Sequence, residues 1–388
     1  DQDMRTIVGN IFESWEVTDD GTEYTIQMRK GMKYSDGEPV TSEDVRFFLE
    51  DFWFDTDLNA SPPWQFRVGG ENLKLEVIDD YSFKLTHAAP FGNFPAHLTR
   101  WEPNNWVGIL TPSHYTKQFH KKYVDEAELN AQAEELGLEG WVALAFARIA
   151  QWGCGVWRGD DWIVESNYPV LGPWMIVERP SEGLYLWERN PYYWKVDLEG
   201  NQLPYIDTMR YDYSSTLENT QLMVMQNQLD AVGMHDVTVN DYPLYKENEP
   251  TATWMVADYV SAMGDRPVLF PNHYLADDPV LTEIVNHPNF VKALSLAIDR
   301  SEINDSLYFG LGVTGQQAPI PTSKYYKEEY GQAWAQYDPD LANQLLDEMG
   351  LDQRDADGFR LRPDGEKLSY LIENTGARIG PAIGKICE

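Results

Sequence analysis

The stretch from Gly183 to Tyr213 constrains the fold more than any other part of the sequence. It opens with the alternating run Leu184–Trp187, and a period of two residues is typical of a half-buried β-strand. The chain then passes Arg189–Pro191, where the proline disfavours a helix, and alternates again from Ile206 to Tyr213. We therefore predict two strands joined by a long connection rich in aromatic residues, which requires a sheet in this part of the fold.

Residues 11–52 carry clear turn and helix signals. Two apolar runs, Ile11–Val17 and Tyr24–Met28, flank an Asp-Asp-Gly turn, and Asp and Gly tolerate the positive φ of a tight hairpin. After a second Asp-Gly turn, Thr41 and Asp44 have the spacing of a capping box. The pattern predicts strand, strand, turn and amphipathic helix. The apolar residues at helical spacing are Val45, Phe48, Leu49 and Phe52.

Further elements follow from periodicity. Residues 71–86 alternate around a pair of aspartates and predict a second hairpin, whereas residues 90–106 indicate an irregular surface or cleft segment. The remaining predictions are helices over 111–136, 141–152, 217–229 and 235–249, and strands over 253–256 and 368–372.

The chain is strongly acidic. It has 63 Asp and Glu against 30 Lys and Arg, a net charge of −33 at neutral pH. Nucleic acids and anionic membrane surfaces carry charge of the same sign, so repulsion argues against both as partners. The acidic surface is explained by solubility in a salty or extracellular medium.

Length and composition indicate a globular protein with several cores. The chain has 388 residues, of which 43% are hydrophobic, enough for two or three cores. No run of 18 apolar residues and no signal segment at the start are present. Cys154 and Cys387 lack metal-ligand spacing and could form one disulfide or remain two thiols. Both ends interrupt a pattern, so we expect the sequence to be incomplete at both ends.

Residues 13–45 resemble the signature of family 5 extracellular solute-binding proteins, the oligopeptide- and dipeptide-type receptors of ABC importers. The family has an "ESW-x-V-x-D-D-G" hairpin, an "R-K-G-x-K-(F/Y)-x-D-G" strand and turn, and a "T-x-E-D-V" helix start. All three occur here in this order, which makes the resemblance specific. In the family these residues build the scaffold and do not bind ligand.

Later motifs extend the resemblance over nearly the whole chain. Glu188–Trp194 resembles the family's "E-R-N-P-x-Y-W" motif, and residues 195–207 match its longer-loop branch. Residues 288–300 and 337–350 resemble two of its helices, and Val268–Asn272 resembles its "Y-x-x-F-N" strand. The family's "G-T-G-P-Y" motif corresponds here to Leu171–Trp174, LGPW, which has bulkier side chains.

The resemblance implies an α/β fold of the periplasmic-binding-protein-like type II class (cluster C), a two-lobed receptor with a hinge and an extra inserted subdomain. Residues 1–165 would be mostly the inserted N-terminal subdomain, 166–262 part of the central lobe with a mixed sheet, and 263–388 the start of the second lobe. Much of the second lobe would then lie outside the sequence.

The sequence offers little for catalysis. No HExxH, GxSxG or GxxxxGK[ST] motif is present, so metal, hydrolase and nucleotide sites lack their usual spacing. We predict no catalytic residue, no metal site and no cofactor. The scattered histidines are His87, His97, His114, His120, His235, His273 and His287.

One segment partly resembles a calcium loop. Asp355, Asp357 and Gly358 fit the pattern, but Gln353 and Asp364 replace two key ligands. A turn is therefore the preferred interpretation.

The tryptophans provide the candidate binding site. Several of the 14 lie in irregular segments rich in Gly, Pro and Asn, where an indole can stack on a sugar ring or line a peptide cleft. The alternative is packing in the core or between lobes, as expected for Trp15, Trp187 and Trp194. The resemblance adds two residues of the "Y-x-x-F-N" strand. The predicted ligand-binding residues are Trp101, Trp106, Trp152, Trp157, Trp162, Phe270 and Asn272.

The resemblance implies a receptor that binds an oligopeptide-like solute between two lobes and delivers it to an ABC permease in the membrane. An oligosaccharide-binding receptor of the same family is the alternative, because some members bind sugars. A secreted carbohydrate-active enzyme would instead need two carboxylates roughly 5 to 9.5 Å apart. The expected protein is a monomeric, non-enzymatic receptor with no nucleic-acid partner. Its expected location is extracellular or periplasmic, with or without a lipid anchor.

Overall fold

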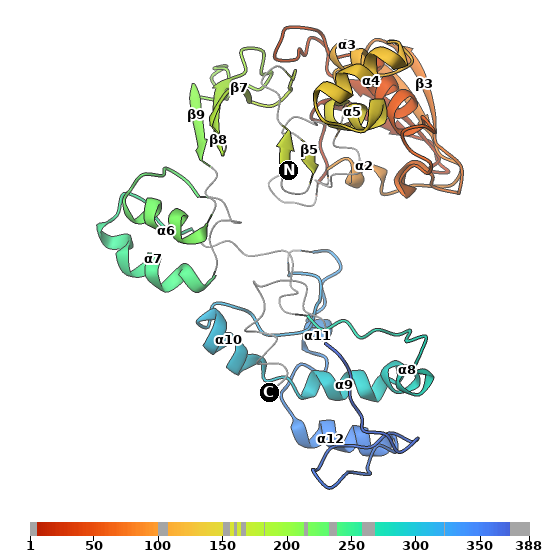
Figure 1. Ribbon diagram of the computed structural model, residues 1–388, viewed down its shortest axis with the longest axis vertical. Coiled ribbons are helices and arrows are strands. Elements are labelled where there is room, and N and C mark those ends of the chain that lie inside the picture. The colour runs from red at the N-terminus through yellow and green to blue at the C-terminus, as the bar shows by residue number, and fades with distance from the viewer. Residues whose placement is uncertain are drawn as a thin grey trace. The chain divides into compact units, whose positions relative to one another are not determined.

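The computed structural model divides the chain into two compact units, Asp1–Ser214 and Ser215–Glu388 (Figure 1). The boundary between them falls inside the predicted central-lobe segment 166–262, and the three-part division of the chain stays a prediction. Each unit is described by itself. The structure describes residues 6–99, 108–149, 156–158, 161–163, 168–181, 183–212, 216–232, 239–257, 268–321 and 323–372.

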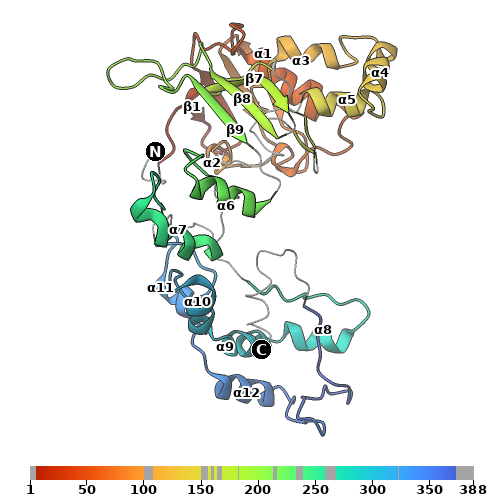
Figure 2. The ribbon, with the colours of Figure 1, turned by 60° about the vertical axis from the view of Figure 1, so that its left-hand side comes forward.

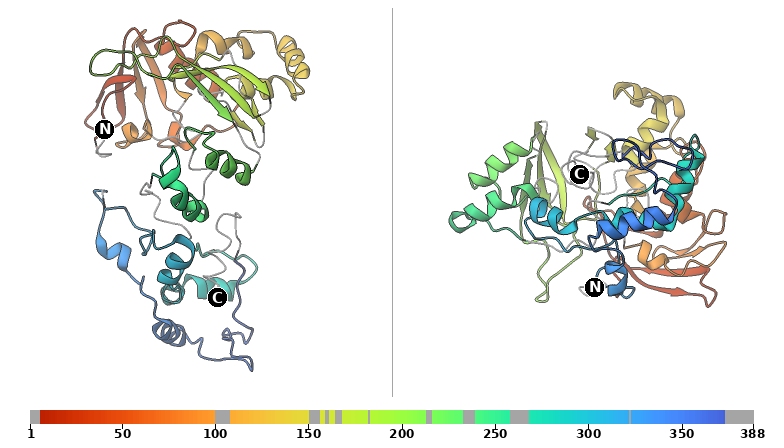
Figure 3. Two further views of the ribbon diagram at one scale, coloured as in Figure 1. Left: turned by 90° about the vertical axis from the view of Figure 1, so that its left-hand side faces the viewer. Right: turned by 90° about the horizontal axis from the view of Figure 1, so that it is seen from below.

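The first unit begins with a four-stranded antiparallel sheet in the order β1-β2-β4-β3. Its strands are the red and orange arrows of Figure 3. Both predicted hairpins are confirmed, since β1 pairs with β2 and β3 pairs with β4. Register irregularities interrupt both edge strands, between Phe12 and Ser14 in β1 and between Val77 and Asp79 in β3. The strands are β1 (Phe12–Val17), β2 (Glu23–Met28), β3 (Lys74–Asp79) and β4 (Ser82–Thr86).

The predicted capped helix follows the first hairpin. It comprises α1 (Ser42–Arg46) and continues as a π-helix, η1 (Phe47–Trp53). The Asp44 carboxylate accepts the Thr41 backbone N–H at 2.9 Å, as its capping-box position predicts. The predicted apolar stripe is confirmed because Val45, Phe48, Leu49 and Phe52 are buried in the core that the sheet covers.

The predicted helix over 111–136 is wrong as a single element. It forms three pieces, of which the first two are contiguous. The third is separated from them because His120 adopts an extended backbone and Asp125 starts a new helix by accepting the Ala127 N–H. The pieces are α3 (Ser113–Thr116), the 3₁₀ turn η4 (Lys117–Phe119) and α4 (Glu126–Glu135). Helix α5 (Gly140–Ile149) then packs against α4 (Figure 2). Two short elements, η2 (Trp64–Phe66) and α2 (Phe94–His97), complete this region.

The two strands predicted within 183–213 are confirmed. Strand β8 (Leu184–Arg189) pairs antiparallel with β9 (Thr208–Asp212) and with the preceding β7 (Trp174–Ser181), in the order β7-β8-β9 (Figure 2). The 190–207 connection folds back on itself, because the Asp197 carboxylate accepts the Glu199 N–H, the Asn201 N–H and the Tyr205 hydroxyl.

The described part of the second unit is helical. Helices α9 and α12 bury Ala293, Leu296, Ala342 and Leu345 between them, and α10 ends at Phe309, which has a left-handed backbone. The helices are α6 (Leu217–Met225), α7 (Tyr242–Asn248), α8 (Pro279–Asn286), α9 (Pro288–Leu296), α10 (Arg300–Tyr308), α11 (Glu328–Gln332) and α12 (Pro339–Glu348).

Three predicted strands are wrong, since none of 253–256, 268–272 and 368–372 is a strand. The side chain of Asn227 turns the chain at Thr253, whose N–H and hydroxyl donate to the amide oxygen at 3.1 and 2.9 Å. At 268–272 Pro271 lacks the N–H that a strand ladder uses. At 368–372 the chain follows an isolated bridge between Leu361 and Lys367, with no partner strand in the part of the chain that is described.

No helix in the described ranges is both long enough and apolar enough to cross a membrane.

Candidate functional site

The structure brings together two of the predicted binding residues. Trp157 and Trp162 are directly paired in the hairpin formed by β5 (Val156–Arg158) and β6 (Asp161–Ile163). Trp101, Trp106 and Trp152 lie outside the described residues.

Phe270 and Asn272 lie in the second unit, on an irregular segment. Phe270 is 76% exposed, and the Asn272 side-chain oxygen accepts the Tyr274 N–H at 3.0 Å, which turns the chain. Their predicted placement on a strand is therefore wrong, whereas an exposed Phe270 is available for contact with a solute.

Sequence reasoning missed a cluster of rings in the first unit, which we call the aromatic cluster. Its outer member is Trp64, which is 60% exposed and lies nearly perpendicular to the His97 ring, with centroids 5.5 Å apart. The His97 ring in turn lies 5.1 Å from that of Phe91. The signal that indicates the other tryptophans, an irregular segment, is also present at Trp64. Ser61-Pro62-Pro63 come directly before it. The cluster consists of Trp64, His87, Phe91, Phe94 and His97.

The inner end of the aromatic cluster is apolar. The His87 ring packs 5.1 Å from that of Phe91 and 5.6 Å from that of Phe94, and neither of its nitrogens has a hydrogen-bond partner among the described residues. Burial lowers the pKa of His87 to about 4, so its ring is neutral at physiological pH. A neutral imidazole in this position acts as a packing group.

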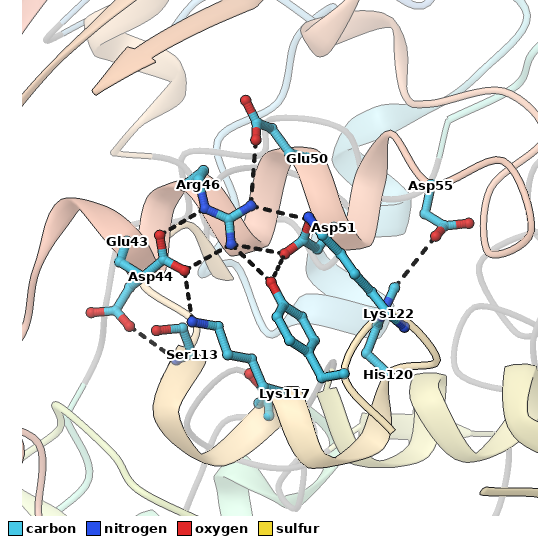
Figure 4. Close-up of polar contacts among 12 residues, drawn as sticks. Glu43, Asp44, Arg46, Glu50, Asp51, Asp55, Ser113, Lys117, His120 and Lys122 are labelled. Carbon is cyan, nitrogen blue, oxygen red and sulfur yellow. Dashed lines mark hydrogen bonds and ion pairs between the residues drawn. The ribbon is translucent and has the colours of Figure 1, made fainter. Parts of the chain in front are cut away.

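The main polar centre of the first unit surrounds Arg46 (Figure 4). Its guanidinium donates to Glu43 at 2.7 Å through two nitrogens and to Asp51 at 2.9 and 3.1 Å. Asp51 also accepts from Lys122 and Tyr123. Although burial opposes it, these hydrogen bonds lower the pKa of the Asp51 carboxyl. We call these five residues, together with Lys117, the Arg46 network.

The Arg46 network joins elements that are distant in the sequence. It links α1 and η1 to residues 117–123, because Lys117 donates to Glu43 at 2.7 Å. Nearby, the buried Asp44 accepts the Ser113 N–H at 2.9 Å and so ties the start of α3 to α1. Since charges of both signs are paired with one another here, the arrangement supports a structural role and not acid–base chemistry.

The described ranges contain no group of three or more His, Cys, Asp or Glu side chains placed to hold a metal ion. The Asp355 segment forms the predicted turn, in which the Asp355 carboxylate accepts the N–H groups of Asp357 and Phe359 at 3.0 and 2.8 Å. Gly358 adopts a positive φ of 87° that favours glycine.

Known proteins resemble this chain over most of its length. The family model described as "Bacterial extracellular solute-binding proteins, family 5 Middle" matches residues 6–384. A periplasmic alpha-galactoside-binding protein of Rhizobium meliloti (strain 1021) is 26% identical over 375 residues, covering 92% of this chain and 48% of the relative.

Solved structures match the same fold. An oligopeptide-binding protein, OppA, is 34% identical with a TM-score of 0.65, covering 92% of this chain and 54% of that one. The periplasmic binding protein MelB of Agrobacterium fabrum C58, in complex with stachyose, is 22% identical with a TM-score of 0.59. The match covers 97% of this chain and 54% of that one. The predicted α/β, periplasmic-binding-protein-like type II fold class is thereby confirmed. The chain spans about half the length of the relatives it matches.

Proposed function

The chain belongs to the bacterial extracellular solute-binding proteins of family 5, and from this we propose that it is a receptor of an ABC importer that binds an oligopeptide-like solute. The observation that carries the proposal is the 34% identity to an oligopeptide-binding protein over 92% of the chain. The matched relatives are solute-binding proteins by name, and the proposal includes that this protein catalyses no reaction.

The proposed mechanism is a shift in conformational equilibrium. Solute binds the closed arrangement of two lobes more tightly than the open one and so increases the closed population. The closed receptor, a monomer in this proposal, then docks on the permease in the membrane. Its proposed location is the periplasm or the cell exterior, with a lipid anchor as a further option. The proposed division is 1–165, 166–262 and 263–388.

Aromatic rings suit the proposed site because they offer a large apolar surface and lose little side-chain entropy on binding. The paired positions of Trp157 and Trp162 on one hairpin support their joint assignment. The proposed contacts are Trp101, Trp106, Trp152, Trp157, Trp162, Phe270 and Asn272.

An oligosaccharide is the second candidate solute. It is favoured by the alpha-galactoside-binding relative, which is 26% identical over 92% of the chain. The many tryptophans also fit it, since indole rings can stack on sugar rings.

Thermal unfolding of the full protein with each solute class tests the proposal. A solute at a concentration 100 times its Kd stabilises the protein by about 2.7 kcal/mol, which raises Tm by several degrees. We expect a mixture of short oligopeptides to raise Tm, and stachyose to leave it unchanged.

The other outcomes separate the alternatives. A rise in Tm with stachyose but not with oligopeptides would identify an oligosaccharide, and not a peptide, as the solute. Hydrolysis of stachyose during the experiment, detected by chromatography of the sugar, would contradict the receptor proposal in favour of a carbohydrate-active enzyme.

A further inference from the structure

We infer that Trp64 is an additional solute-contact residue, a stacking surface for a ligand that presents an aliphatic C–H face. Such a face is offered by a sugar ring and equally by a leucyl or prolyl side chain of a peptide. The inference rests on the proposed receptor function and extends its site to a residue outside the predicted set.

The first observation is the exposure of the ring. Trp64 is 60% exposed, the highest value among the tryptophans whose side chains the structure describes. A broad indole surface left in water costs free energy that a bound apolar group recovers. Exposure of one ring alone is common on protein surfaces, so the argument depends on how the ring is held.

The second observation is that Trp64 is held in place before any ligand arrives. The 3₁₀ turn closes with hydrogen bonds from Phe66 N–H to the Pro63 carbonyl at 3.0 Å and from Arg67 N–H to the Trp64 carbonyl at 2.9 Å. Phe66 is fully buried, and the centroid of its ring lies 6.0 Å from that of Phe48 and 5.5 Å from that of Trp53. The turn is therefore anchored in the core by Phe66.

The ring itself is also supported. The His97 and Phe91 rings lie beside the indole, with centroids at 5.5 and 6.2 Å and interplanar angles of 85° and 64°. Both supporting rings are buried. A ring fixed by its neighbours loses little conformational entropy when a ligand stacks on it.

The third observation is position. The indole packs on the end of α2 at His97. Asn93, at the N-cap of the same helix, is exposed; its amide nitrogen lies 3.2 Å from His97 Nε2, and its amide oxygen can accept a hydrogen bond from a solute. An apolar surface with a few polar groups at its edge is the usual composition of a ligand site.

Hydroxyl-radical footprinting of the unmodified protein tests contact directly. Trp64 should oxidise rapidly in the free protein because it is exposed. A saturating short oligopeptide or stachyose, whichever the protein binds, should slow this oxidation. Leu198, a fully exposed apolar residue of the same unit, is the internal control and should oxidise at the same rate with and without solute.

Substitution measures the energetic effect. Trp64→Ala should weaken binding of that solute about fivefold to tenfold, as loss of a ring contact predicts, and Trp64→Phe should retain most of the affinity. Leu198→Ala is the matched control and should bind as the wild type does. The Tm of the free Trp64→Ala protein should stay close to that of the wild type because the ring is mostly exposed.

The outcomes are distinguishable. Equal affinity of the wild type and Trp64→Ala, or no protection of Trp64 by a bound solute, would overturn the assignment of Trp64 and leave the receptor function intact. A wild-type protein that binds neither oligopeptides nor stachyose would overturn both.

Discussion

Among single residues, His87 has the clearest consequence for stability. Its pKa in the folded protein is about 4 because of burial, against an ordinary value of 6.5. The unfolded chain therefore binds a proton more readily than the folded one at acidic pH. The contribution of His87 to stability is complete above pH 6.5 and is lost as the pH falls through about 4. The free energy of unfolding decreases by about 3 kcal/mol over this range.

Replacing His87 with Leu should remove that part of the pH dependence. We expect urea unfolding to show a smaller loss of stability between neutral pH and pH 4 for His87→Leu than for the wild type. Phe91→Leu changes a neighbouring ring without a titratable group, so it should lower stability equally at both pH values. An unchanged pH profile in His87→Leu would contradict the assignment.

The binding residues show where prediction from sequence reaches its limit at this scale. Trp157 and Trp162 were selected because their segment is irregular, yet they occupy paired positions in a short hairpin. Trp64 meets the same criterion of an irregular segment, but this criterion does not tell which rings are exposed, because the exposure of Trp64 depends on Phe66 being buried beside it. Which neighbour anchors a turn in the core is a tertiary property that local patterns do not contain.

At the scale of elements, the Arg46 network fixes α1 and η1 to residues 117–123. Arg46→Met keeps the aliphatic stem but leaves the buried Asp51 with fewer partners, so we expect a loss of about 2 to 3 kcal/mol in the free energy of unfolding. Urea denaturation at neutral pH measures this loss.

Two companion variants sharpen that experiment. Arg46→Lys keeps the charge but loses the forked geometry, and it should give an intermediate loss. Arg210→Met removes an exposed arginine paired with Asp212 at 2.9 Å, and its effect should stay within about 0.5 kcal/mol. Equal effects of Arg46→Met and Arg210→Met would show that the network contributes nothing beyond a surface pair.

Sequence patterns located the elements of the first unit well and those of the second unit less well. The hairpins formed because turn residues and alternation agreed over residues 11–28 and 71–86. The strands predicted over 253–256 and 368–372 depended on short runs of mostly apolar residues alone. A strand also needs a neighbour to accept and donate its backbone hydrogen bonds, and the described part of the second unit offers none.

The whole molecule carries a net charge of −33, and this charge destabilises a compact state by self-repulsion. Added salt screens that repulsion over a distance of about 10 Å at 0.1 M. We expect the Tm to rise by several degrees when sodium chloride is raised from low to physiological concentration.

A charge variant provides the control for the salt effect. Glu134 and Glu135 lie exposed in the last turn of α4, where the helix dipole adds to the repulsion, and their replacement by Gln should reduce the rise in Tm with salt. Sucrose at equal osmolality should stabilise the wild type and the variant to the same extent, because it carries no charge. A Tm that does not change with salt would contradict a role for self-repulsion.

The interrupted edges of the four-stranded sheet have a consequence for the proposed binding of extended peptides. An open, regular edge strand pairs with any extended chain through its backbone. Here a register irregularity breaks each edge, and charged residues such as Glu13, Glu16 and Glu76 lie along them. A peptide that met such an edge could not form a continuous ladder on it. The sheet can therefore support the first unit without becoming an unselective peptide site that competes with the proposed one.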